Sequence, residues 1–247
     1  MTIKCLAFDL DGTLLLDGSK KIDPRTFDSI QKAMAQGMHI VIASGRDKNG
    51  CKFVYEPLGL ENGNHFLALV NGQIIYDFEN KEYDLDDVLT TEDGIKIQKV
   101  CKEFGVEGIF QCGYDFYSYI SSLNRVKKKV KNAILGEPDD YGLKDGRENR
   151  NFIDLPFEEI RLTQDINKVI MVHTPKFFEK NFDGIKAALS DYDVLLVGPD
   201  WLEIMPKHVS KASALWKICD QLGISMNEVM AFGDAQNDLK MLQQVGI

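Results

Sequence analysis

Several features that would assign a chain to a special class are missing from this sequence of 247 residues. It contains no low-complexity segment, no internal repeat and no N-x-S/T acceptor for glycosylation. Its longest purely apolar runs, such as FLALV (66–70), are about five residues long and cannot span a bilayer. Met1 leads directly into a strand-like run, a pattern unlike that of a secretory signal. We therefore expect a soluble protein.

Cysteine is also sparse and lacks any ordered pattern. The chain has five cysteines, no two of them in a C-x-x-C motif, at positions Cys5, Cys51, Cys101, Cys112 and Cys219. An odd number of scattered cysteines suits reduced thiols better than a disulfide framework. The sequence therefore predicts a cytoplasmic location.

Positive charge is in deficit. Lysine and arginine number 29 against 38 acidic residues, which gives a net charge of −9 and a pI near 5.0. Proteins that bind nucleic acids or anionic membranes without specificity need a cationic surface, so neither partner is expected. An anionic small-molecule substrate would need a local cationic pocket or a metal ion. The hydrophobic fraction of 44% excludes a largely disordered chain.

Apolar and amphipathic segments alternate over the first eighty residues. Residues 3–10, 38–44 and 66–72 read as buried strands, and 22–37 reads as a helix. That helix has a capping aspartate, a proline at its first position and a closing glycine. A second helix-like stretch ends near 58–60. This alternation of strands and helices predicts a Rossmann-like, doubly wound parallel sheet, a fold of the α/β class.

The pattern changes after about residue 82 and returns near residue 207. The intervening stretch mixes strands and helices without regular alternation, which predicts an inserted α+β domain over 83–206. The core would then be discontinuous, 1–82 with 207–247. Within the insert we expect helices at 91–105, 122–134 and 177–190, strands at 110–120, 168–173, 193–198 and 201–206, and a loop at 136–151. Beyond it we expect a helix at 210–223, a strand at 229–234 and the start of another helix.

Two carboxylates end the first strand, in FDLDGT (8–13). Side chains alternate along a strand, so Asp9 and Asp11 lie on the same side, where their charges repel unless a cation or a proton intervenes. Gly12 then permits a tight departure from the sheet. The alternative of a plain turn or helix cap stays open. An EF-hand is excluded, because its glycine and glutamate positions hold Leu14 and Lys20.

Three further stretches carry candidate site residues. In ASGR (43–46), Ser44 and the N–H groups of Gly45 and Arg46 could bind an anion, although any turn can contain Ser-Gly. Lys211 follows the expected N-cap of a helix, where a cation opposes the dipole by about 0.3–1 kcal/mol unless a phosphate binds there. A surface lysine would tolerate that cost.

The last stretch is GDAQND (233–238). Asp234 follows a buried strand as Asp9 does, and the two would form an oxygen-rich pocket suited to Mg²⁺ if their strands end at one crevice. Asn237 and Asp238 fall in the first turn of the next helix, where an acidic residue can equally be an ordinary cap.

Taken together, F-D-L-D-G-T, A-S-G-R, V-S-K and G-D-A-Q-N-D resemble the four motifs of the haloacid dehalogenase superfamily phosphatases. LVNGQIIYD (69–77) and WLEIMPKHVSKASAL (201–215) resemble the entry to and exit from the cap in the Cof-like branch. The similarity covers essentially the whole chain. The family usually has a glycine where Ala212 stands, and it continues with another strand and helix, so we expect a C-terminal truncation.

The resemblance implies a Mg²⁺-dependent phosphatase of small phosphomonoesters, such as sugar phosphates, that works through an aspartyl-phosphate. Asp9 would be the nucleophile and Asp11 the general acid and base. The roles implied for the other residues are a metal site formed by Asp9, the Asp11 backbone carbonyl, Asp234 and Asp238, and a phosphate site formed by Ser44, Gly45, Lys211 and Asn237. Asp9→Asn should then abolish turnover.

Two other functions stay open on the sequence. One is a phosphomutase of the same fold, and the other is a phosphometabolite-binding regulatory protein without turnover. In the insert, the aromatic run YDFYSYI (114–120) could face a substrate, but alternating aromatics are typical of a packed sheet face. The basic run RVKKKVK (125–131) is interpreted as a solvated helix face.

Overall fold

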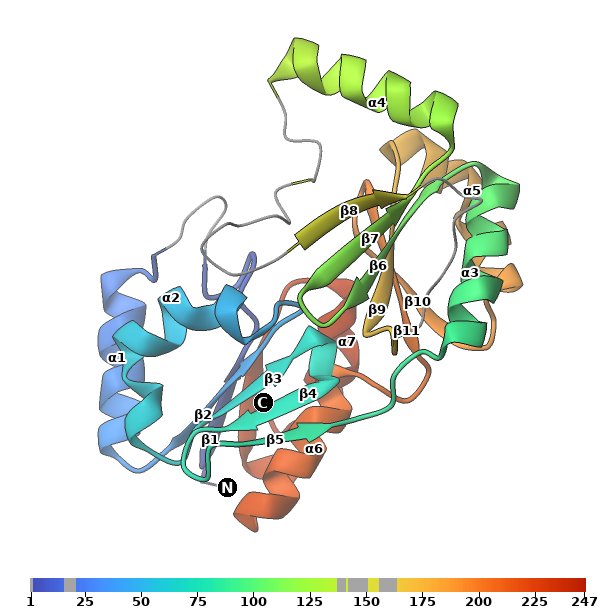
Figure 1. Cartoon of the computed structure of the whole chain (residues 1–247). Helices are drawn as coiled ribbons and strands as arrows, with labels where there is room; N and C mark the ends of the chain where they lie inside the picture. The colour runs from blue at the N-terminus through green and yellow to red at the C-terminus, as the bar shows by residue number, and fades with distance from the viewer. Residues whose placement is uncertain (1, 16–20, 137–140, 142–150, 156–163) are drawn as a thin grey trace. The chain divides into compact units, whose positions relative to one another are not determined.

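The computed structural model describes residues 2–15, 21–136, 141, 151–155 and 164–247 (Figure 1). The chain divides into two compact units. Met1–Asp87 and His208–Ile247 form the first, and Val88–Lys207 forms the second. Within the described residues, no helix combines the length and the apolarity that a membrane crossing requires.

The first unit contains one sheet and its flanking helices. Its elements are β1 (Cys5–Phe8), α1 (Pro24–Ala35), β2 (His39–Ala43), α2 (Lys48–Leu58), β3 (Phe66–Leu69), β4 (Ile74–Asp77), β5 (Glu82–Leu85), α6 (Lys211–Leu222), β12 (Val229–Phe232) and α7 (Leu239–Leu242). Short 3-10 turns occur at Leu60–Asn62, Val70–Gly72, Met226–Glu228 and Gln236–Asp238.

The sheet of this unit has the strand order β12-β1-β2-β3-β4-β5. The first four strands in that order are parallel, with Ala7 of β1 opposite Ala231 of β12 and Val41 of β2. Helices α1 and α2 lie on one face, and α6 and α7 lie on the other (Figure 1). The predicted α/β core with a parallel sheet is therefore confirmed. Because parallel strands end at the same edge, the residues that follow β1, β2 and β12 are brought together there.

Helix α6 shows why the sequence folds as it does locally. Ser210 caps it by accepting the N–H of Ser213 at 3.1 Å, and Gly223 ends it in the left-handed region at φ 64°. Its inward face, which includes Leu215 and Ile218, is fully buried in a cluster formed with the strands. The helix predicted over 210–223 is confirmed with its caps.

Two details of the first unit differ from the prediction. The strand expected over 66–72 ends at Leu69, because Val70–Gly72 turn sharply and return the chain as the antiparallel strand β4. The helix expected to begin in residues 237–246 is short, a single 3-10 turn followed by α7.

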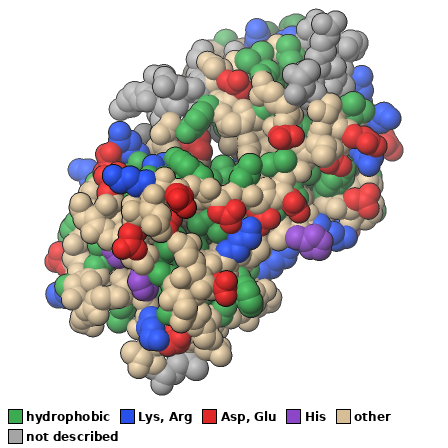
Figure 2. Space-filling model, turned by 60° about the horizontal axis from the view of Figure 1, so that its bottom comes forward, with side chains coloured by type: hydrophobic (Ala, Val, Ile, Leu, Met, Phe, Trp, Pro, Cys, Tyr) green, Lys and Arg blue, Asp and Glu red, His purple; other side chains and the backbone are tan. Residues whose placement is uncertain are grey.

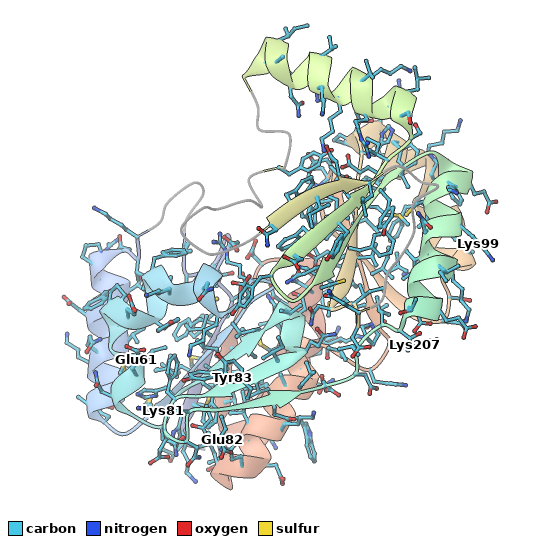
Figure 3. The ribbon with its side chains drawn as sticks, in the orientation of Figure 1. Glu61, Lys81, Glu82, Tyr83, Lys99 and Lys207 are labelled. Atoms are coloured by element: carbon cyan, nitrogen blue, oxygen red, sulfur yellow. The ribbon has the colours of Figure 1, made fainter. Side chains whose placement is uncertain are left out.

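Strand β5 lies at the sheet edge and pairs with β4. All four of its residues are exposed, and Glu82 and Asp84 place charge on the edge, a common protection against edge-to-edge pairing. Tyr83 of this strand, labelled in Figure 3, contacts Tyr76 of β4, with the ring centroids 4.6 Å apart. The domain boundary predicted after residue 82 falls inside β5, whose pairing keeps the strand in the core sheet.

The second unit has a mixed sheet of its own. Its elements are α3 (Thr91–Phe104), β6 (Glu107–Cys112), β7 (Asp115–Tyr119), α4 (Ser122–Leu135), β8 (Asn151–Leu155), β9 (Lys168–Val172), α5 (Pro175–Ala188), β10 (Tyr192–Gly198) and β11 (Trp201–Pro206). The order is β10-β11-β9-β6-β7-β8, antiparallel except for β7 and β8. Residues of α3 and α5 pack with the sheet in one cluster, which confirms an α+β cap unit.

Most of the aromatic run of the second unit is packed, as alternating aromatics on a sheet face predict, whereas Tyr114 at its start is 45% exposed. Phe116 and Tyr119 are buried, and Tyr119 meets Phe110 edge to face at 5.1 Å between centroids. The basic run forms α4, whose Val126 and Val130 are more than half exposed. The loop predicted over 136–151 lies almost entirely outside the described residues.

Charged side chains are spread over the surface. On the face shown in Figure 2, acidic and basic groups are interspersed.

Candidate active site

Asp9 and Asp234 meet where β1 and β12 end. The N–H of Asp9 continues the strand ladder by donating to the carbonyl of Phe232 at 2.9 Å. Gly12 then turns the chain at φ 89°, and a Cβ at this position would overlap the Asp234 carboxylate. The two loops can approach this closely only because residue 12 is glycine.

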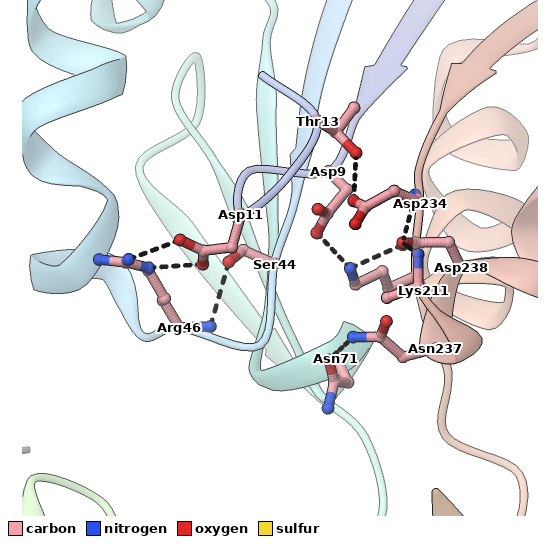
Figure 4. A network of polar contacts seen from close by, with 11 residues as sticks. Asp9, Asp11, Thr13, Ser44, Arg46, Asn71, Lys211, Asp234, Asn237 and Asp238 are labelled. Atoms are coloured by element: carbon pink, nitrogen blue, oxygen red, sulfur yellow. Dashed lines mark hydrogen bonds and ion pairs between the residues drawn. The ribbon is translucent and has the colours of Figure 1, made fainter. Parts of the chain in front are cut away.

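Lys211 is the centre of the polar network (Figure 4). Its side chain is fully buried, and its Nζ donates to Asp9 Oδ1 at 2.5 Å and to Asp238 Oδ1 at 2.7 Å. An ammonium has three donors, and with these two acceptors among the described residues one N–H remains for a ligand. The sequence predicts that this lysine holds phosphate, which stays a prediction; what the structure shows is its contact with the carboxylate of Asp9.

The pKa values follow from this burial. Burial raises the pKa of Asp9 to about 6, against the lowering effect of Lys211 and with a further rise from Asp238. Burial lowers the pKa of Lys211, but the carboxylates of Asp9 and Asp238 outweigh it and the net shift is upward. The lysine therefore stays protonated, and Asp9 holds its proton up to a higher pH than an exposed aspartate does.

Asp234 and Asp238 are held by separate contacts. Thr13 Oγ1 donates to Asp234 Oδ1 at 2.6 Å. Asp238 Oδ2 accepts the backbone N–H groups of Asp234 at 3.2 Å and Ala235 at 3.0 Å. Asp238 thus caps the short helical segment, the ordinary function considered for it, and also reaches into the site.

Three carboxylates form a group that could hold a cation. Asp9, Asp234 and Asp238 each offer an oxygen, and these atoms lie within 4.8 Å of one another. Three negative charges face one ammonium, which leaves an excess of negative charge in a site where Asp9 and Asp238 are buried and Asp234 is exposed. Carboxylate oxygens are the ligands that hard divalent cations such as Mg²⁺ prefer. The residues fit such an ion.

Asp11 is placed apart from this group. Its carboxylate accepts a two-pronged contact from Arg46, with Nε at 2.8 Å and Nη2 at 2.7 Å, and Figure 4 shows it turned toward Arg46. The side chains of Arg46 and Asp11 are 38% and 58% exposed. Surface pairs of this kind contribute about 0–1 kcal/mol, so the contact can be exchanged for another.

Ser44 and Gly45 follow β2, as predicted, but the expected anion-binding pair of amides is incomplete. The N–H of Arg46 donates to Ser44 Oγ at 3.2 Å, so it is engaged within the turn. Ser44 itself is buried at 1% exposure beside the site. Asn237 lies on the other side, where its Nδ2 donates to Asn71 Oδ1 at 3.0 Å (Figure 4).

Three residues of this network were not predicted from the sequence. Thr13, Arg46 and Asn71 stand inside the quoted motifs, yet none was assigned a side-chain function. Thr13 and Arg46 bind predicted site carboxylates through contacts between distant segments. The only signal available was their position next to the predicted residues.

Comparison with known proteins adds independent information. A family profile described as haloacid dehalogenase-like hydrolase matches residues 6–247. A predicted phosphatase of Streptococcus pyogenes is 30% identical over 99% of this chain and 86% of its own length. A Bacillus subtilis phosphatase of 5-amino-6-(5-phospho-D-ribitylamino)uracil is 24% identical over 98% of this chain and 83% of its own length.

Solved structures show the same fold. A haloacid dehalogenase-like hydrolase from Bacteroides thetaiotaomicron superposes with a TM-score of 0.73 at 24% identity, covering all of this chain and 87% of that one. A sugar phosphatase of HAD subclass IIB gives a TM-score of 0.75 at 22% identity, covering 99% and 85%. The chain belongs to the haloacid dehalogenase-like hydrolase family and is a phosphatase of that family, a hydrolase of phosphomonoesters.

Proposed function

We propose that this phosphatase hydrolyses small phosphomonoesters, sugar or polyol phosphates above all, with Mg²⁺ as cofactor and through a phosphoryl group carried on Asp9. Family membership implies a divalent metal and a phosphorylated small-molecule substrate. The Mg²⁺ ion and the phosphoryl group on Asp9 are proposed from one observation. Asp9 is 5% exposed, and its carboxylate is held by a buried lysine with two further carboxylates beside it.

Asp9 is arranged as a nucleophile. Lys211 holds Oδ1, which fixes the carboxylate and leaves Oδ2 for attack on phosphorus. In the first step an O–P bond forms to Asp9 while the ester P–O bond breaks, and the leaving oxygen takes a proton. In the second step water attacks the phosphorus, the bond to Asp9 breaks, and inorganic phosphate is released.

Asp11 is the group proposed to give that proton and later to take one from the water. To do so, its carboxylate must leave Arg46, and the weak, half-exposed ion pair permits the exchange. Gly12 follows Asp11 directly, and because it has no side chain the Asp234 carboxylate can lie close to this part of the backbone. Asp9 and Asp11 thus have different surroundings, one buried against a lysine and one exposed, as their different functions require.

Asp9, Asp234 and Asp238 would hold the Mg²⁺ ion, with the Asp11 carbonyl as a further ligand. The ion would neutralise charge on the phosphoryl group, the main electrostatic need of phosphoryl transfer. Lys211 adds a fixed positive charge from the chain itself, and its remaining N–H is available to a phosphate oxygen. Ser44 and Asn237 border the same space from opposite sides.

The substrate class is inferred from the relatives. One relative is named for a phosphorylated ribitylamino compound, and one structural neighbour is a sugar phosphatase. Both names describe a phosphate carried by a polyhydroxylated carbon chain. We therefore expect polyol and sugar phosphates to be turned over faster than phosphate esters of aromatic or amino-acid alcohols.

The test is a panel of phosphomonoesters assayed for free phosphate with and without Mg²⁺, using wild type, Asp9→Asn and Asp28→Asn. Asp28 is an exposed aspartate of α1 and serves as the matched control. We expect Mg²⁺-dependent phosphate release by wild type and by the control, and none by Asp9→Asn. If no ester released phosphate and the esters were isomerised instead, the protein would be a phosphomutase and the proposal would be wrong. Binding without turnover would replace it by a regulatory protein.

A further inference from the structure

Three successive residues in the first unit have a left-handed backbone. The φ angles of Val70, Asn71 and Gly72 are 50°, 56° and 95°. This region is uncommon for residues other than glycine, and a β-branched valine is an outlier there. Such a turn persists only where its surroundings hold it, and conformations of this kind concentrate at functional sites.

The turn is held by the two loops that carry predicted phosphate ligands. The N–H of Val70 donates to the Arg46 carbonyl and the N–H of Asn71 to the Ser44 carbonyl, both at 2.9 Å. On its other side, a Cβ on Gly72 would overlap the carbonyl oxygen of Ser210, the residue that precedes Lys211. The turn therefore fills the space between the loop after β2 and the start of α6.

The Asn71 side chain contacts a third predicted ligand. Asn71 is 2% exposed, and its Oδ1 accepts the Nδ2–H of Asn237 at 3.0 Å. A carbonyl oxygen can only accept, so this contact determines which end of the Asn237 amide faces Asn71. The Oδ1 of Asn237 is buried and receives no hydrogen bond from any described residue. A buried acceptor of this kind is costly unless a ligand supplies the donor.

We propose that Asn71 is a positioning residue: it orients the Asn237 amide toward the bound substrate, and its left-handed turn sets the separation of Ser44 from Lys211. The inference rests on the proposed function, because it concerns the same site. In this proposal Asn71 acts through Asn237 and through the backbone of its neighbours. Neither the sequence pattern nor the names of the relatives assigned it this function.

The test separates the side chain from the backbone. Asn71→Gly keeps a left-handed turn without strain and removes the amide. We expect it to lower kcat/KM for the best polyol phosphate of the panel by about tenfold or more, because the Oδ1 of Asn237 is placed to accept a hydrogen bond from a substrate hydroxyl. The inhibition constant of inorganic phosphate, which offers mainly acceptor oxygens, should change by less. Asn62→Gly is the matched control, since Asn62 is an exposed asparagine of the same unit. It should retain wild-type kinetics, and both variants should unfold at temperatures within a few degrees of each other.

A double-mutant cycle tests whether Asn71 acts through Asn237. If it does, Asn71→Gly should change kcat/KM little once Asn237→Ala is present, because the shared contact has already been lost. If the fold-losses in kcat/KM of the two single variants multiplied in the double variant, the proposal would be overturned. Wild-type kinetics for Asn71→Gly would also overturn it. A wild type that releases no phosphate would instead refute the proposed function, so the two failures are distinct.

A second variant covers the case in which the glycine variant does not fold. Asn71→Asp keeps an acceptor oxygen and tolerates a positive φ. We expect its kcat to stay within about threefold of wild type while its KM rises, because it places a negative charge beside a site for an anion. A kcat as low as that of Asn237→Ala would overturn the positioning function.

Discussion

Replacing Lys211 with methionine should destabilise the first unit strongly. The substitution keeps the approximate shape of the side chain but removes a buried ammonium that contacts Asp9 at 2.5 Å and Asp238 at 2.7 Å. Asp9 and Asp238 are 5% and 0% exposed, so two carboxylates would face each other without water. Removing one partner of a buried ion pair costs about 3–5 kcal/mol. We expect a loss of that size in the free energy of unfolding, without added divalent metal.

The assay can be confined to the first unit. The two tryptophans lie in different units, Trp201 in β11 and Trp216 on α6. In a Trp201→Phe background, the fluorescence of Trp216 during urea unfolding reports the first unit alone. The matched control is Lys217→Met on the same helix, because Lys217 is 42% exposed and pairs with surface aspartates at 3.2–3.3 Å. Its loss should be within about 1 kcal/mol.

The reasoning about Lys211 would be refuted if Lys211→Met were no less stable than the Lys217→Met control. A further check is Lys211→Met combined with Asp238→Asn. This pair of changes leaves only one carboxylate stranded, so it should recover part of the lost stability relative to Lys211→Met alone. Added Mg²⁺ should also stabilise Lys211→Met, since it would supply the missing positive charge.

Three more outcomes follow from single contacts. Gly12→Ala should cost about 1–3 kcal/mol in a thermal melt and raise the Mg²⁺ concentration needed for activity, because its Cβ would overlap Asp234. Burial, with a further contribution from His39, lowers the pKa of His65 to about 4. Its unfolded value is near 6.5, so urea stability should fall as the pH drops from 6.5 towards 4, by at most about 1.4 kcal/mol per unit, and His65→Asn should flatten this decline. Lys168→Met should cost about 3–5 kcal/mol, because it removes the ammonium that contacts the buried Glu203 in the second unit. The double change Lys168→Met with Glu203→Leu should recover most of that loss, as measured by urea unfolding of the second unit with Trp201 fluorescence in a Trp216→Phe background.

The fold was largely predictable because its signals are local. Alternating strand and helix patterns, capping residues such as Ser210 and closing glycines such as Gly223 identified the parallel core and the mixed insert. The turn at Val70 was missed because its left-handed backbone is imposed by neighbouring loops, against the preference of a β-branched residue. The apolar run through residue 70 gave no sign that the strand would stop.

The candidate site was predictable as a set of residues but not as a network. Strand ends placed Asp9 and Asp234 together, since parallel strands share an edge. Two contacts could not be predicted, the one between Lys211 and Asp9 and the one between Asp11 and Arg46. Both join segments that lie far apart in the chain. No spacing rule contains that information, so such partners come only from the folded structure.

The central claim is that Asp9 carries the phosphoryl group, and a rapid acid quench measures this directly. Wild type would be mixed with Mg²⁺ and a phosphate-labelled substrate from the panel, quenched within the first turnover, and digested for peptide mapping. We expect the label on the peptide that contains Asp9, with homoserine at that position after borohydride reduction. Label on another residue, or a full first turnover of phosphate release by Asp9→Asn, would contradict the account.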